Sequence, residues 1–63
     1  MTKEQVRECT ARTLTKLKSV LSNDEYSNHE KITWEVFDEM YRIFKPVYDF
    51  IPTNMVSDYL SQK

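Results

Sequence analysis

The chemistry that this sequence could support begins with His29, because an imidazole binds metal ions and transfers protons near neutral pH. The carboxylates of Asp24, Glu25 and Glu30 lie close to it in the chain. Metal sites that use histidine usually add further His or Cys ligands, but the sequence contains one His and one Cys. We therefore expect no metal site, and we interpret His29 as a solvated residue in the first turn of a helix.

Cys9 could serve as a nucleophile, and Glu35 with Glu39 could serve as an acid/base pair. A catalytic thiol needs a base beside it, and the available base, His29, lies across a polar turn. The two glutamates are four residues apart on one helix face, so one of them could act as a general acid if a cleft raised its pKa. Arg42 lies close to both, which favours an ordinary charged surface. We predict no catalytic residues, no cofactor and no small-molecule substrate.

Length and composition limit the fold to one small helical domain over residues 1–63. The 63 residues include no Gly and one Cys, which excludes Gly-rich phosphate-binding loops, Gly-dependent hairpin turns and an internal disulfide. A chain this short buries only about 60% of the surface of its unfolded form, so a second copy or a partner is an expected source of stability. We find no run of ~20 apolar residues and no apolar signal-peptide core. We expect a cytoplasmic protein without membrane contact.

The elements that must carry these side chains are two long helices that form an antiparallel hairpin. Thr2 and Gln5 have the Thr-x-x-Gln spacing of a capping box, and apolar residues then recur with helical periodicity. This pattern predicts a first helix over about 3–22. Ser27 and the glutamate three residues after it form a second capping box. That box predicts a second helix over about 28–51.

Two prolines shape the end of this hairpin. Pro46 removes one backbone donor from the second helix, but the apolar pattern continues through it in the same phase. We therefore expect a helix that is kinked near Pro46 and continues. Pro52 ends it, and Thr53 can cap a short C-terminal helix over about 53–61. The predicted fold class is all-α, a helical hairpin plus a short third helix.

The second predicted helix has an apolar surface that covers about 200° of its circumference, twice the width of the stripe that one packing contact needs. This surface divides into two rows with the three- and four-residue steps of helix packing. The aliphatic row consists of Val36, Met40, Ile43, Val47 and Phe50. The aromatic row consists of Trp34, Phe37, Tyr41, Phe44 and Tyr48. Two rows require two neighbours.

We predict that the first helix covers the aliphatic row, because its Leu and Val side chains match that row. The third helix reaches only the end of the aromatic row, near Phe44 and Tyr48, which leaves Trp34, Phe37 and Tyr41 uncovered. Trp and Tyr are enriched at interface hot spots. The five aromatic residues are therefore the predicted partner-binding surface, for a second copy of the chain or for a different protein. The alternative is that a better-wrapped first helix buries them as monomer core.

Nucleic-acid binding is the alternative function, since a basic helix can contact phosphates or enter a major groove. Residues 1–22 contain five basic and two acidic side chains, whereas residues 23–63 contain four basic and eight acidic ones. The candidate polyanion-binding residues are Lys3, Arg7, Arg12, Lys16 and Lys18. The acidic second helix and the long break before it argue against a helix-turn-helix DNA-binding motif. Nucleic-acid binding therefore ranks second to protein binding.

The segment 48–53, Tyr-Asp-Phe-Ile-Pro-Thr, closes the long predicted helix and opens the short one. It resembles the C-terminal end of the Hha-type nucleoid modulators over roughly a dozen residues, and the similarity does not extend to residues 35–44. The resemblance implies that a helical protein of this size can regulate through a protein partner. Our hypothesis from the sequence is a non-enzymatic interaction module that regulates or inhibits a partner protein, self-associates, or does both.

Overall fold

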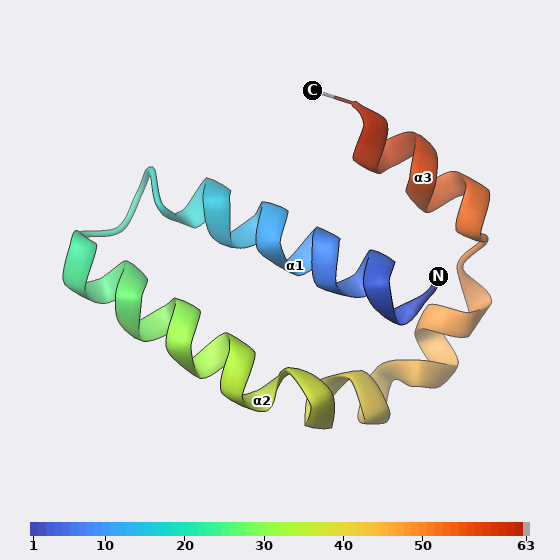
Figure 1. The fold of residues 1–63 in the computed structure, drawn as a ribbon, viewed down its shortest axis with the longest axis horizontal. Helices are drawn as coiled ribbons and strands as arrows, with labels where there is room; N and C mark the ends of the chain where they lie inside the picture. Colours follow the sequence, from blue (N-terminus) through green and yellow to red (C-terminus); the bar gives the residue numbers. More distant parts are fainter. Residues whose placement is uncertain (63) are drawn as a thin grey trace.

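The computed structural model describes residues 1–62, and this part of the chain folds into three α-helices without a strand. They are α1 (Lys3–Leu17), α2 (Asn23–Phe50) and α3 (Thr53–Ser61). Helix α1 contacts α2 on one side and α3 on another, and it lies between them in Figure 1. The predicted all-α hairpin with a short third helix is confirmed.

Helix α1 begins where the capping box predicts. The Thr2 hydroxyl oxygen accepts a hydrogen bond from the backbone N–H of Gln5 (3.1 Å), and the Gln5 side-chain oxygen accepts one from the backbone N–H of Thr2 (2.9 Å). The end of the helix differs from the prediction, because it lies at Leu17 and not near residue 22. The Ser19 hydroxyl donates to the carbonyl of Lys16 at 2.8 Å. A serine that binds the backbone in this way favours a turn over further helix.

Removal of the cap in the Thr2→Ala variant is expected to lower the free energy of unfolding by about 1 kcal/mol. The N–H group of Gln5 at the start of α1 then loses its partner, and urea denaturation followed by circular dichroism measures the loss. Thr15→Ala is the matched control, because the Thr15 hydroxyl binds the Ala11 carbonyl inside α1 and alanine has the higher helix propensity. Equal losses in the two variants would contradict the capping role.

Helix α2 begins at Asn23, five residues earlier than the predicted start near Asn28. Ser22 is the N-cap, and its hydroxyl oxygen accepts a hydrogen bond from the backbone N–H of Glu25 at 3.3 Å. This pair has the same Ser-x-x-Glu spacing as the predicted pair five residues later, and the earlier pair is the one that starts the helix. Asp24 and Glu25 in the first turn also place negative charge at the positive end of the helix dipole.

Helix α2 continues through Pro46 as predicted, and Figure 1 shows its C-terminal part curving away from the line of the first part. The Lys45 ammonium and the Asp49 carboxylate form an ion pair at 2.7 Å across this turn. The hydrogen bond to Asp49 and its negative charge raise the pKa of Lys45.

The amino group of Met1 donates to the carbonyl of Ile51 at 2.5 Å, which places a positive charge at the negative end of the α2 dipole.

Helix α3 packs against α1, and the prediction that it would cover the end of the aromatic row is wrong. Val56 is the buried residue of α3, and polar side chains of α1 bind both ends of the helix. The Gln5 amide donates to the carbonyl of Thr53 at 3.2 Å. The Arg12 guanidinium donates to the carbonyl of Tyr59 at 2.8 Å, where a cation also stabilises the negative end of the helix dipole. Helix α1 is thus the middle helix of the fold.

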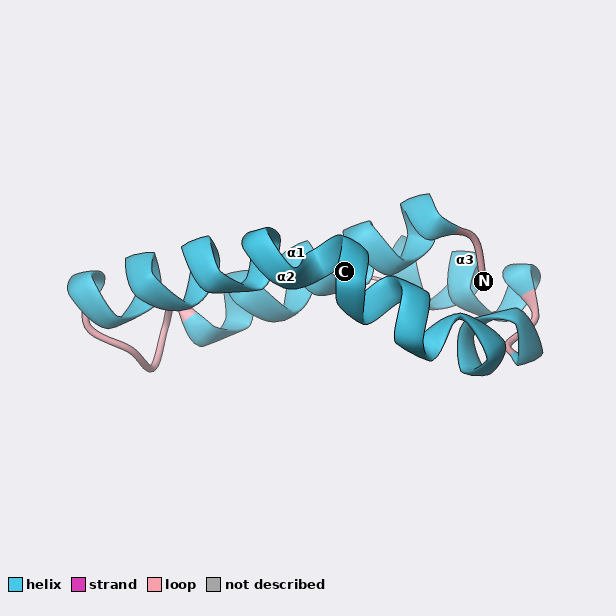
Figure 2. Ribbon diagram, turned by 90° about the horizontal axis from the view of Figure 1, so that it is seen from below, coloured by secondary structure: helices cyan, strands magenta, loops and turns pink. Residues whose placement is uncertain are grey.

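The three helices form one flat layer. The extents of the backbone are 35 × 29 × 13 Å, and Figure 2 shows this layer from its edge. In Figure 1, which looks down the shortest axis, no helix lies over another, so the layer is one helix deep. In residues 1–62 the buried apolar core consists of Val6, Leu14, Phe37 and Val56. A layer with so small a core leaves many apolar side chains exposed to solvent.

Candidate functional site

The aromatic row of α2 faces α1. Phe37 retains 6% of its accessible surface, and Trp34, Tyr41 and Tyr48 are half-buried. Phe44, the remaining member of the row, is 39% exposed. The prediction that α1 covers the aliphatic row and leaves Trp34, Phe37 and Tyr41 without a cover is therefore wrong.

Basic side chains on α1 explain why it packs on the aromatic row. The Arg7 guanidinium lies 5.4 Å from the ring centroid of Trp34 and 5.0 Å from that of Phe37. The Lys3 ammonium lies 5.4 Å from the ring centroid of Tyr41. Cations are attracted to the faces of aromatic rings, and the alkyl stems of Lys and Arg cover apolar surface as well. The aliphatic row offers only the second of these two interactions over most of its length.

The aliphatic row is consequently the uncovered apolar surface of α2. Its members are exposed by between 42% for Met40 and 89% for Phe50. Ile32, one turn before Val36, is 58% exposed and extends the row towards the start of α2. We call the following six side chains the exposed row: Ile32, Val36, Met40, Ile43, Val47 and Phe50. Isolated exposed apolar residues are ordinary, but a contiguous line of them marks an interaction surface.

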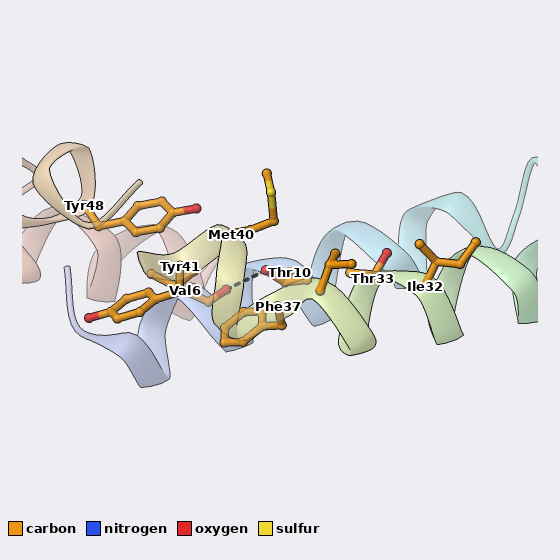
Figure 3. Close-up of a pocket in the computed structure, with 9 residues that line it drawn as sticks. Val6, Thr10, Ile32, Thr33, Phe37, Met40, Tyr41 and Tyr48 are labelled. Atoms are coloured by element: carbon orange, nitrogen blue, oxygen red, sulfur yellow. Dashed lines mark hydrogen bonds between the residues drawn. The ribbon is translucent and has the colours of Figure 1, made fainter. Parts of the chain in front are cut away.

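An apolar pocket of about 280 Å³ adjoins the exposed row. Ile32, Val36 and Met40 line it from the exposed row, and Val6 and Thr10 line it from α1. The other lining residues are Thr33, Phe37, Tyr41 and Tyr48. Figure 3 shows the lining side chains, with Val6 and Thr10 coming from α1 and the others from α2. The pocket therefore connects the exposed row with three of the five predicted partner-binding residues.

A charged edge runs beside the exposed row. Glu35, Glu39 and Arg42 are all exposed, and the Arg42 guanidinium donates to the Glu39 carboxylate. The two glutamates are solvated, one of them is paired with a cation, and neither lines the pocket. Charged side chains of both signs therefore flank the middle of the exposed row.

The five candidate polyanion-binding residues do not share one free face. Successive residues lie about 100° apart around a helix, so Arg12 and Lys16 lie on a different side of α1 from Lys3 and Arg7. Arg7 lies over the aromatic row, and Arg12 binds the end of α3. Both arginines among the candidates are therefore engaged in contacts within the chain.

Two of the other basic candidates, Lys3 and Lys18, also contact the chain itself. The Lys3 ammonium forms an ion pair with the Asp38 carboxylate at 3.0 Å. Lys18 follows α1, and its ammonium lies 5.6 Å from the ring centroid of Tyr26. The hydrogen bond to the Glu30 carboxylate, with burial and the charge of that carboxylate, raises the pKa of Tyr26. The contact between Lys18 and Tyr26 spans the break between α1 and α2.

The side chains of catalytic type lie outside the pocket lining. Cys9 is a half-buried free thiol on α1, and His29 is exposed near the start of α2. Among residues 1–62, no group of three or more His, Cys, Asp or Glu side chains could hold a metal ion. Over the same residues, no helix combines the length and the apolar composition needed to cross a bilayer.

Comparison of the chain with protein-family models, with curated proteins and with solved structures finds no match. The similarity of residues 48–53 to the Hha-type modulators is therefore not extended to a family assignment. The exposed row and the adjoining pocket are the observations that bear on function.

Proposed function

We propose that this chain is a non-enzymatic protein-interaction module that binds another polypeptide through the exposed row of α2 and the adjoining pocket. The observation that carries the proposal is the line of solvent-exposed apolar side chains from Ile32 to Phe50. Their three- and four-residue steps are those of helix-to-helix packing. An amphipathic helix laid along this line would bury its own apolar face there.

The pocket supports the proposal because it offers a place for an anchoring side chain. Alkyl and aromatic groups line it, together with the hydroxyl groups of Thr10, Tyr41 and Tyr48. Large side chains that fill such pockets near the middle of an interface carry much of the binding free energy. Phe44 lies beside Tyr48, with 6.3 Å between the ring centroids, so the aromatic residues predicted from the sequence would border the bound partner.

Regulation or inhibition of the bound polypeptide, in the cytoplasm, is the role that we propose for this module. The chain presents a contact surface on a rigid helix, and a protein that binds without reacting acts by covering or holding its target. A cytoplasmic location would also keep the free thiol of Cys9 reduced.

Site-specific photo-cross-linking in cells that express the chain tests the proposed surface. A photoreactive phenylalanine analogue in place of Val36 should give covalent adducts with a polypeptide. The same analogue in place of Thr15, an exposed residue of α1, is the control and should give none. Mass spectrometry of the adduct identifies the bound polypeptide.

The adduct must depend on the exposed row and not on mere proximity. Adding Ile43→Glu to the chain labelled at position 36 should abolish the adduct, since a carboxylate on an apolar contact surface is costly to desolvate. Adducts that survive this change, or equal adducts from positions 36 and 15, would contradict the proposed function.

The contacts of the basic residues do not favour the nucleic-acid alternative. Binding to phosphates gains affinity from several free cations in one surface. Lys3, Arg7 and Arg12 instead contact a carboxylate, aromatic rings and backbone carbonyls of the same chain. Protein binding is therefore the function that we propose.

A further inference from the structure

The chain exposes more surface than a compact monomer of its size. A folded monomer of 7.6 kDa has an accessible surface of about 4,300 Å², whereas this chain has 5010 Å². The excess of about 700 Å² is close to the ~800 Å² that each partner buries in a standard protein interface. The single layer of helices explains the excess, because domains bury their apolar faces between two packed layers. A second layer of equal size, packed on this one, would bury the excess surface.

The exposed row is complementary to itself when one copy of α2 is turned end to end. Two antiparallel copies that cross midway between Met40 and Ile43 place Met40 of each against Ile43 of the other. The same crossing places Val36 against Val47. Each contact layer then consists of aliphatic side chains that can interdigitate as knobs into holes. The row is about 27 Å long at the rise of an α-helix, so the contact can run along most of α2.

Charge favours the antiparallel direction. Glu39 and Arg42 flank the same edge of the exposed row. Along the helix, Glu39 comes before the crossing point and Arg42 comes after it. In the antiparallel pair, Glu39 of each copy therefore lies next to Arg42 of the other. A parallel pair would instead bring together two acidic first turns, each with Asp24 and Glu25, and like charges would repel. The formal net charge of −1 on the chain makes the overall repulsion between two copies weak.

We propose that the polypeptide bound by the exposed row is a second copy of this chain, and that the two copies form a symmetric dimer through antiparallel α2 helices. The inference rests on the proposed function and names the partner for the same surface, so the polypeptide that the module regulates is then another copy of itself. The contact is isologous, so each exposed row covers the other. The dimer has two layers of helices, with the two exposed rows as its central core.

Analytical ultracentrifugation of the purified chain from micromolar to millimolar concentration tests the dimer. We expect a monomer–dimer equilibrium in which Ile43→Glu raises the dissociation constant by about 30-fold or more. Val20→Glu is the matched control, since Val20 is an exposed apolar residue outside the row, and it should leave the equilibrium unchanged. Circular dichroism should show equal helicity in both variants, because both substituted residues are solvent-exposed.

A mixing experiment tests the antiparallel register. Glu39→Arg and Arg42→Glu each put like charges side by side across the crossing point, so each variant alone should dimerise about 2- to 30-fold more weakly. An equal mixture of the two variants should regain the original affinity as a mixed dimer, which native mass spectrometry distinguishes by mass. A mixture that shows no preference for mixed dimers overturns the proposed register.

Two results would overturn the second copy as partner. One is a chain that stays monomeric at millimolar concentration, and the other is a dimer that Ile43→Glu leaves intact. Cross-links from position 36 to a polypeptide of different mass, with a monomeric chain, would overturn the dimer and leave the proposed function standing. A monomeric chain without any cross-link from position 36 would remove both.

Discussion

The Phe37→Ala variant is expected to be largely unfolded. Phe37 is the buried residue of α2, with the Arg7 guanidinium over its ring and the Trp34 ring centroid 5.5 Å away. Truncation of a buried phenylalanine costs about 3–5 kcal/mol. A domain of this size has a total stability of only about 3–5 kcal/mol. The substitution therefore removes about as much free energy as the fold possesses.

Circular dichroism during urea titration measures this effect, at a protein concentration low enough to keep the chain monomeric. Phe50→Ala is the control, since it deletes the same atoms from a side chain that is 89% exposed. Its free energy of unfolding should change by less than about 0.5 kcal/mol. A stably folded Phe37→Ala variant would contradict the assignment of the aromatic row as the contact between α1 and α2.

The number, order and direction of the helices could be predicted from the sequence because their signals are local. The Thr2 cap, the apolar periodicity through Pro46 and the break at Pro52 each act within a few residues. The two boundaries that differ have local causes as well. Ser22 and Ser27 both head a Ser-x-x-Glu box, and the sequence alone does not rank two equivalent caps five residues apart.

The assignment of neighbours to the two rows of α2 could not be predicted in the same way. Both rows have the spacing of a helix contact, so periodicity alone leaves the choice open. The choice depends on Lys3 and Arg7, whose charges can lie over rings of the aromatic row. Lys3 and Arg7 were predicted only as phosphate ligands, whereas in the fold they pack over aromatic rings. The sequence was enough to predict that α2 has more apolar surface than its own chain can cover. It was not enough to predict which of the two rows stays exposed.

The second large effect is expected from Val56→Asp, and it should be confined to α3. Val56 retains 4% of its accessible surface where α3 packs on α1, and a carboxylate buried there without a cation costs several kcal/mol. Helix α3 has nine residues, and isolated helices shorter than about 12–15 residues are marginal in water. Helix α3 should therefore detach and lose its helical structure, while the hairpin of α1 and α2 keeps its contact through Phe37.

Hydrogen exchange measured by mass spectrometry distinguishes local from global loss in this variant. Amides of α3 should exchange freely, whereas those of α2 around Phe37 should stay protected, as expected for parts of a fold with separate opening free energies. Met55→Asp is the control on the same helix, because Met55 is 61% exposed, and it should leave α3 protected. Loss of protection throughout Val56→Asp would show that α3 and the hairpin unfold as one unit. Since the exposed row lies on α2, a variant that loses only α3 should still dimerise.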